Sequence, residues 1–310
     1  MSLTSYPTAR QVRFAYLVTA LGGLLFTIDL PLLRLSQAEP WTMVFARGSF
    51  LFIAISFAWL ISRRRGEAAP FIAGKAGLLV ALTSTIGNIA YISAIMQTNA
   101  ANVVFIIALT PVIAALLSRA VLGERIHSYT WFAVYFAFFG VGIIAWDGMS
   151  AASPWASLLA LLSAFCSATA FTVVRATGRK IATSLALGNL ASAIVALVFF
   201  GASVPALLVS GALGIPAWVW LGLNGLIAIP LATVMLASGP RYLPTADVSM
   251  FFMLETVLTP IWIWMIFSEV PSSAVLIGGG IVITTLIVHS WWRVGSVRMP
   301  GARETVHQES

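Results

Sequence analysis

Stretches of about 20 apolar residues recur along the whole chain, and no other feature limits its possible folds as strongly. A helix of that length crosses roughly 30 Å of hydrocarbon at about 1.5 Å per residue. The stretches lie near residues 14–33, 41–62, 75–97, 101–119, 129–147, 154–175, 184–204, 216–239, 245–267 and 272–293. The sequence therefore predicts an all-α membrane protein with ten transmembrane helices.

The composition agrees with a chain that lies mostly in lipid. Hydrophobic residues make up 60% of it and charged residues only 9%, against roughly 25% charged residues in soluble domains. The connections between the apolar stretches are short, and none resembles a soluble domain. We expect a multi-pass protein whose main surroundings are membrane lipid.

The basic residues predict the orientation of the chain. If both termini are cytoplasmic, all but two of the 17 Lys and Arg residues fall on the cytoplasmic side, as the positive-inside rule requires. The exceptions are Arg34, outside, and Arg47, within a predicted helix. The net charge of +7 then reflects topology, and no aromatic-interleaved basic motif indicates a nucleic-acid partner. We expect a protein of the inner (plasma) membrane.

The sequence also contains a weak internal repeat. At a constant offset the segment from Ala101 aligns without a gap with the segment from Ala246, and Glu124 aligns with Glu269. A unit with an odd number of helices must insert its second copy upside down, which gives an inverted repeat with a site between the halves. We expect a first five-helix repeat at 1–148, a second, inverted repeat at 149–293, and a disordered cytoplasmic tail at 294–310.

Four segments carry a resemblance to a known family. They read "FARGSFLFIA", "ANVVFIIALTPVIAALLSRAVLGERI", "LLSAFCSATAFTVVRA" and "ASGPRYLPTADVSMFFMLETVLTP". They resemble the drug/metabolite transporter superfamily, specifically its ten-helix EamA type, and this resemblance implies export of a small solute. In the family a proline usually follows the acid that matches Glu255, whereas this chain has Thr256 there and Pro260 later.

Glu255 is the ionisable residue nearest the middle of a predicted span. Such a group costs at least about 2.5–3.5 kcal/mol at the bilayer centre and normally faces protein or water. Two interpretations stay open: a cavity-lining acid that binds an amine or a proton, or a protonated packing residue that is hydrogen-bonded.

A polar and aromatic stripe accompanies Glu255 on the predicted ninth helix. At 100° per residue four side chains fall within about 80° of one another. They are Asp247, Phe251, Glu255 and Trp262. The repeat aligns Asn102 and Thr110 with the two acidic positions, so both polar positions recur as polar ones. We expect both stripes to line one central cavity, although Asp247 has an alternative role at a helix start or gate and Trp262 as a packing residue.

Two further intramembrane charges are Asp29 and Arg47, which lie at similar predicted depths near the outer ends of the first two spans. An ion pair between them is expected, either as a structural pair or as an outer gate.

A third polar group comes from Asn88 and Tyr91, which share a helix face. They either bind a polar solute, with Phe165 supplying apolar surface, or hydrogen-bond to a neighbouring helix.

Enzyme motifs give no competing interpretation. No HExxH and no Walker-type loop occurs, and the single Cys166 cannot form a cysteine-based metal site. We expect no cofactor and no metal.

The favoured function is export of small metabolites, most of all amino acids including aromatic ones, by alternating access. Exporters of nucleobases, amines or drugs remain alternatives, as do a channel or a non-transporting scaffold. The sequence does not fix the oligomeric state, and a monomer is consistent with it.

Overall fold

The computed structural model describes residues 9–66, 70–97, 103, 106–123, 128–146, 154–179, 181–268, 270 and 272–296. These residues form helices joined by short connections, with one isolated bridge between Ser210 and Pro216. The helices predicted from the sequence are therefore confirmed as the dominant structure. Asn102 and the end of the predicted tail, 297–310, lie outside the described residues.

The helices of the first half lie at the predicted spans, except that the first span is divided in two and α6 extends beyond the predicted end of 101–119. They are α1 (Ala9–Phe26), α2 (Asp29–Ser36), α3 (Pro40–Arg64), α4 (Gly74–Gln97), α6 (Thr110–Leu122) and α7 (Ser128–Trp146). The long helices of the second half are α8 (Pro154–Thr177), α9 (Ala182–Phe199), α11 (Ile229–Ser238), α13 (Met253–Phe267) and α14 (Ser273–Ser296). The shorter pieces are η1 (Pro205–Leu208), η2 (Ala212–Gly214), α10 (Ala217–Gly222), η3 (Leu223–Ala228), η4 (Gly239–Arg241) and α12 (Thr245–Met250).

Seven helical segments of the described chain are long and apolar enough to cross a membrane. Three shorter apolar helices accompany them, at Thr110–Leu122, Ser128–Ile143 and Ser273–His289. Length and composition thus identify a helical membrane protein. The count of ten spans stays a prediction.

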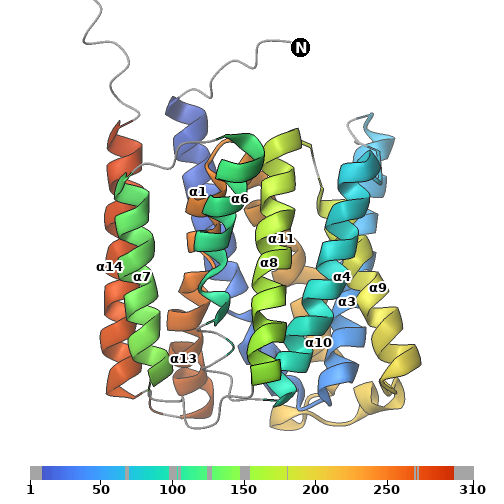
Figure 1. Cartoon of the computed structure of the whole chain (residues 1–310). Coiled ribbons are helices and arrows are strands. Elements are labelled where there is room, and N and C mark those ends of the chain that lie inside the picture. The colour runs from blue at the N-terminus through green and yellow to red at the C-terminus, as the bar shows by residue number, and fades with distance from the viewer. Residues whose placement is uncertain are drawn as a thin grey trace, which may run out of the picture.

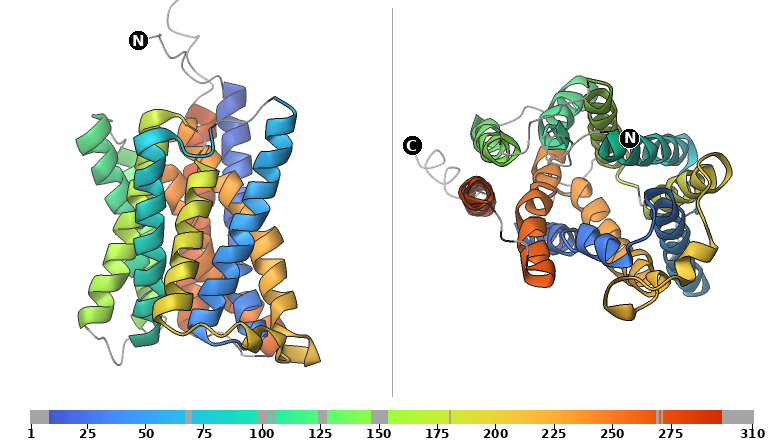
Figure 2. Two further views of the ribbon diagram at one scale, coloured as in Figure 1. Left: turned by 90° about the vertical axis from the view of Figure 1, so that its right-hand side faces the viewer. Right: turned by 90° about the horizontal axis from the view of Figure 1, so that it is seen from below.

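The helices stand roughly side by side and surround a central space (Figures 1 and 2). The most extensive contacts join α3 to α9, α4 to α8, α7 to α14 and α1 to α11. The contact between α7 and α14 depends on Gly140, because a Cβ atom there would lie 2.6 Å from the carbonyl oxygen of Gly278. Small residues permit such close approach between membrane helices.

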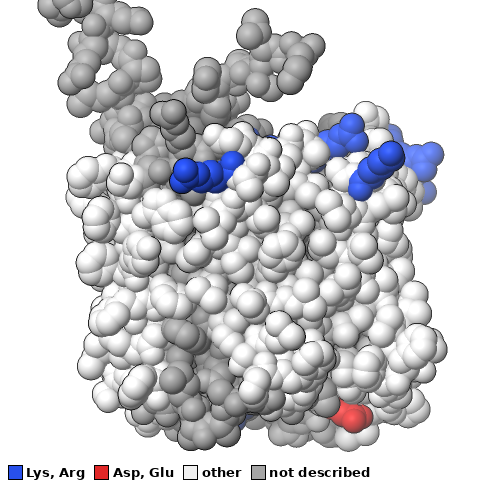
Figure 3. Space-filling view, viewed as in Figure 1, with Lys and Arg blue, Asp and Glu red and all other residues white. Residues whose placement is uncertain are grey.

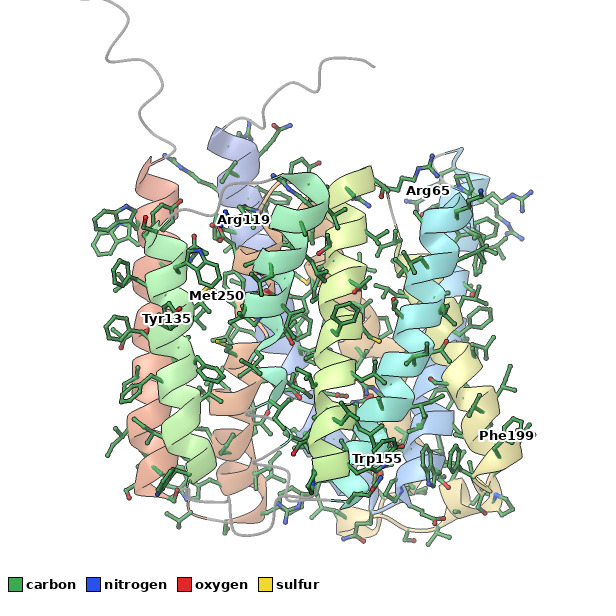
Figure 4. All side chains as sticks on the ribbon, in the orientation of Figure 1. Arg65, Arg119, Tyr135, Trp155, Phe199 and Met250 are labelled. Atoms are coloured by element: carbon green, nitrogen blue, oxygen red, sulfur yellow. The ribbon has the colours of Figure 1, made fainter. Side chains whose placement is uncertain are left out.

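Charged side chains on the face seen in Figure 3 lie at the two ends of the bundle, with uncharged atoms between them. Arg65 and Arg119 both lie at the end where α1 begins (Figure 4). Tyr135 and Phe199 are 67% and 76% exposed, which is typical of side chains that face lipid.

The first predicted span is broken at Thr27 and Ile28, between α1 and α2. Pro31 explains the break, because proline has no N–H to bond the carbonyl four residues earlier, which belongs to Thr27. The hydroxyl of Thr259 on α13 donates to that carbonyl instead, at 3.2 Å. A backbone group freed inside a membrane protein needs such a partner, so this bond holds α13 against the break.

A second proline acts in the same way at the start of α6. Pro111 leaves the carbonyl of Ile107 without its helical partner, and the hydroxyl of Thr110 donates to it at 2.6 Å. Thr110 is 3% exposed. Its side chain therefore closes a helix end.

The ninth predicted span is also broken, which corrects the expectation of one helix over 245–267. The structure has α12 and α13 separated at Phe251 and Phe252. There the backbone bonds run from residue i to i−3, as in Leu254 to Phe251 and Glu255 to Phe252, which winds the chain more tightly than an α-helix. Asp247, Phe251, Glu255 and Trp262 consequently do not form one continuous face.

The eighth span contains a π-helical segment, η3, immediately before α11. Pro230 follows in the first turn of α11, and π-turns commonly absorb such local changes. Gly225 of η3 lies against α3, where a Cβ atom would meet Phe50 Cβ at 2.6 Å and the Arg47 carbonyl at 3.2 Å. This close approach brings the neighbouring Asn224 to the first helix break.

Candidate functional site: a central polar cavity

A cavity of about 530 Å³ lies in the centre of the bundle. Residues of α2, α3, α4, α8, α9, α11 and α13 contribute to its wall. The volume is in the range of sites that enclose one small molecule. Three charged residues lie on the wall, and they are the only ones among the described residues that line it: Asp29, Arg47 and Glu255.

Asp29 is held on both sides of its carboxylate. Arg47 Nη2 lies 2.8 Å from Oδ2, and Asn224 Nδ2 donates to Oδ1 at 2.7 Å and to the backbone oxygen of Asp29 at 3.2 Å. Asp29 is 4% exposed and Asn224 is fully buried. The expected proximity of Asp29 and Arg47 is thus seen as an ion pair at the start of α2.

Glu255 stands in the first turn of α13, where its carboxylate benefits from the positive end of the helix. Its side chain makes no hydrogen bond or ion pair with any residue that the structure describes. It lies within electrostatic range of both Asp29 and Arg47. Because Asp29 and Arg47 neutralise each other, Glu255 is the carboxylate on the wall that lacks a local counter-charge.

A polar patch on α4 and α9 forms another part of the wall. Asn88 donates through Nδ2 to Asn189 Oδ1 at 2.6 Å and to Ser192 Oγ at 3.4 Å. Asn189 in turn donates to the Leu185 carbonyl at 2.9 Å. Asn88 therefore bridges two helices, as one expectation had it, and it also borders the cavity, while its role in solute binding stays a prediction.

Tyr91 lies one turn further along α4 and also lines the cavity. It is within electrostatic range of Glu255, Asp29 and Arg47, so the phenol and the three charges surround the same space. Phe26, Phe171 and Phe252 add aromatic surface to the wall. The cavity thus combines a charged region with apolar walls.

The other predicted site residues lie away from this cavity. Phe165 is 47% exposed, and Thr110 closes the start of α6. Phe251 is buried against Tyr16, with ring centroids 6.4 Å apart. Trp262 donates through Nε1 to Thr27 Oγ1 at 2.9 Å, at the first helix break.

Asp247, predicted as a gate or ion-pair residue, is buried outside the cavity wall. The hydroxyl of Tyr16 donates to its Oδ2 at 2.5 Å, and Nε2 of His289 lies 3.7 Å from its Oδ1. Asp247 is therefore part of a separate polar cluster near the end where α1 begins.

Sequence reasoning missed Asn224, Asn189 and Thr259. Each is a polar residue in an otherwise apolar stretch, and this pattern can be seen in the sequence. The bonding partner cannot be predicted in this way, because each side chain bonds to a residue at least 101 positions away.

Comparison with known families agrees with this architecture. Residues 13–146 match the family described as the EamA-like transporter family. This segment of the chain is therefore similar to an EamA-like transporter domain. The match confirms the resemblance to the drug/metabolite transporter superfamily. The matched segment includes α2, α3 and α4, and with them Asp29, Arg47, Asn88 and Tyr91 of the cavity wall.

A solved chain with the description "Crystal structure of protein" is similar to this chain in fold. The TM-score is 0.73, the alignment covers 90% of this chain and 98% of the solved chain, and the sequence identity is 16%. At that identity the similarity concerns the fold. None of the curated proteins searched matches the chain.

Proposed function

We propose that this EamA-like protein is an inner-membrane secondary transporter that exports small metabolites by alternating access, with amino acids, including aromatic ones, as its substrates. The cavity carries this proposal. A volume of about 530 Å³ accommodates one such solute, and the charged groups and phenyl rings provide surfaces for its polar and apolar parts.

Helix contacts that fit the expected inverted repeat support alternating access. In such a repeat α4 of the first half corresponds to α11 of the second, and α1 corresponds to α8. The contact between α4 and α8 therefore has the contact between α11 and α1 as its counterpart, and both contacts occur. Likewise α9 corresponds to α3, and η3 belongs to the same span as α11. The contact between α4 and α9 therefore has the contact between η3 and α3 as its counterpart, which also occurs. Two halves that pack by one scheme around a central cavity can rock to expose it on either side.

In this proposal Glu255 receives the ammonium group of the solute. An ammonium ion supplies the counter-charge that Glu255 lacks, and low-dielectric surroundings strengthen the attraction. Tyr91 and Asn88 offer hydrogen bonds beside it. Arg47 is the cationic residue on the cavity wall that could receive a solute carboxylate. Its Nε has no hydrogen-bond partner among the described residues.

Export of amines is a second candidate, and the charge balance of the wall favours it. When Glu255 is ionised, the ion pair of Arg47 and Asp29 leaves one net negative charge on the wall, at Glu255. A solute with one net positive charge would neutralise the cavity, whereas a zwitterion would not. The two candidates differ in whether Arg47 must leave Asp29 to bind a carboxylate.

Binding to the purified protein distinguishes these candidates. Phenylalanine, its methyl ester and phenethylamine share a ring and an ammonium group, but only phenylalanine has a carboxylate. Amino-acid export predicts that phenylalanine binds best, by about tenfold or more, and that Arg47→Gln removes this preference. Tighter binding of the ester and the amine favours amine export, and no binding of all three contradicts both candidates.

A further inference from the structure

A buried polar cluster joins four helices outside the central cavity. It consists of Tyr16 on α1, Thr130 on α7, Asp247 on α12 and His289 on α14, and each of these residues is at most 5% exposed. None of the four lines the central cavity. A group of this composition therefore needs an explanation separate from solute binding.

The contacts within the cluster form a chain. Tyr16 donates to Asp247 Oδ2 at 2.5 Å. Nε2 of His289 lies 3.7 Å from the other oxygen of Asp247 and 3.4 Å from Thr130 Oγ1. The ring of Tyr129 is tilted over His289 with centroids 5.8 Å apart. His289 can thus turn its Nε2 toward either a hydroxyl or a carboxylate.

α12 connects this cluster to the cavity. This six-residue helix carries Asp247, and it also carries Ser249, which lines the cavity. The tight turn at Phe251 and Phe252 then leads to Glu255 on α13. A displacement of α12 relative to α14 would therefore move part of the cavity wall.

Protonation of His289 changes how strongly α12 and α14 attract each other. A neutral imidazole provides no charge for Asp247, whereas an imidazolium forms a buried ion pair with it. Histidine changes its charge at about pH 5–8, depending on its surroundings. If His289 binds a proton more tightly when α12 is packed against α14, protonation in turn stabilises that packed arrangement.

We propose that Asp247 and His289 form a proton-binding site, separate from the solute cavity, which fixes α12 against α14 and closes the cavity at the end where α1 begins. The proton comes from water at that end and forms an N–H bond at Nε2 of His289. This N–H donates to Oδ1 of Asp247. When α12 moves away, the N–H bond breaks and the proton returns to the water.

The neighbouring titratable groups fit this role. Asp247 on α12, Tyr16 on α1 and Tyr129 on α7 are titratable groups that contact one another or His289 within the cluster. His289 also lines a second hollow of about 690 Å³ between α7 and α14.

Cysteine labelling tests the proposal without a solute. Cys166 borders the cavity, so it is first replaced by serine, and Ser249→Cys is introduced as the probe. The full chain is placed in inside-out vesicles and treated with an impermeant maleimide at about pH 5–8. Because protonation closes this end, labelling should slow by about fivefold or more as the pH is lowered, after correction for the reactivity of a free thiol.

His289→Gln should remove this pH dependence, and Asp247→Asn provides a second variant if the first does not insert. Thr285→Val is the matched control on α14, because among the described residues its hydroxyl bonds to the carbonyl of Ile281 in its own helix alone, at 2.7 Å. It should keep the dependence, and so should Glu255→Gln. A wild-type rate that does not vary with pH, a dependence that survives in both cluster variants, or its loss in Glu255→Gln would overturn the proposal.

Discussion

At the scale of single residues, the cavity wall separates two kinds of carboxylate. Asp29 is held by Arg47 and Asn224, so it acts as part of the scaffold that positions Arg47. Glu255 has no such partner among the described residues, so its charge is available to a solute. Both residues are carboxylates, so the side-chain type alone does not separate the two roles. The neighbouring residues of each carboxylate do.

Tyr91→Ala should weaken transport of phenylalanine by about tenfold and transport of alanine much less, because only a large side chain uses the contact area of the phenol. The ratio of the two transport rates in proteoliposomes measures this effect. Phe165→Ala is the matched control, since Phe165 is exposed on the outside. Equal losses for both solutes in Tyr91→Ala would mean that Tyr91 only packs.

At the scale of the elements, broken helices determine where polar groups face the cavity. The break between α1 and α2 places Asp29 at a helix start, and the turn between α12 and α13 places Glu255 in a first turn. Each break frees backbone groups that must find partners in a protein surrounded by lipid. The hydroxyl of Thr259 and the carbonyl of Thr27 are such a pair.

Thr259→Val should destabilise the protein by about 1–3 kcal/mol, because it leaves the carbonyl of Thr27 buried without a donor. Adding Pro31→Ala should recover part of this loss, since an alanine at that position would supply the missing helical N–H. The free energy of unfolding in detergent, measured for both single variants and the double variant, gives the coupling. Thr285→Val is the control with little expected loss. Additive effects of Thr259→Val and Pro31→Ala would refute this account of the break.

The sequence predicts the elements of the fold better than it predicts the site. Apolar length located the spans, and the depth of Asp29 and Arg47 predicted their ion pair. The ideal-helix geometry used for Asp247 and Phe251 failed, because the i−3 bonds near Phe251 rotate everything before them. Trp262 lies on α13 with Glu255, but its side chain bonds to Thr27 and does not line the cavity. No local pattern in the sequence marks that turn, since the nearest proline in α13, Pro260, lies beyond Glu255.

At the scale of the whole molecule, the distribution of charge predicts an orientation of the bundle. Arg65 and Arg119 lie at the end where α1 begins (Figure 4), which the positive-inside rule assigns to the cytoplasm. Glu39 precedes the 25 residues of α3 that end at Arg64, so it lies at the opposite end. This orientation is the condition for describing transport as export.

Cysteine scanning tests the orientation directly. In a Cys166→Ser background, Glu39→Cys should react with an impermeant maleimide added to intact cells, and Arg65→Cys should react only after the membrane is opened. Both positions are exposed and have ordinary negative φ angles, so the substitutions fit the backbone. Labelling of Arg65→Cys in intact cells would reverse the assignment of the two sides.

Counterflow in proteoliposomes tests the central claim, that the cavity around Glu255 is a transport site reached alternately from each side. Vesicles loaded with unlabelled phenylalanine should transiently accumulate labelled phenylalanine, with saturation, because a carrier exchanges solutes one for one. Glu255→Gln should reduce this accumulation by about tenfold or more while the protein remains folded, since the ammonium group loses its counter-charge. Linear flux without accumulation, or wild-type counterflow in well-folded Glu255→Gln, would contradict the account.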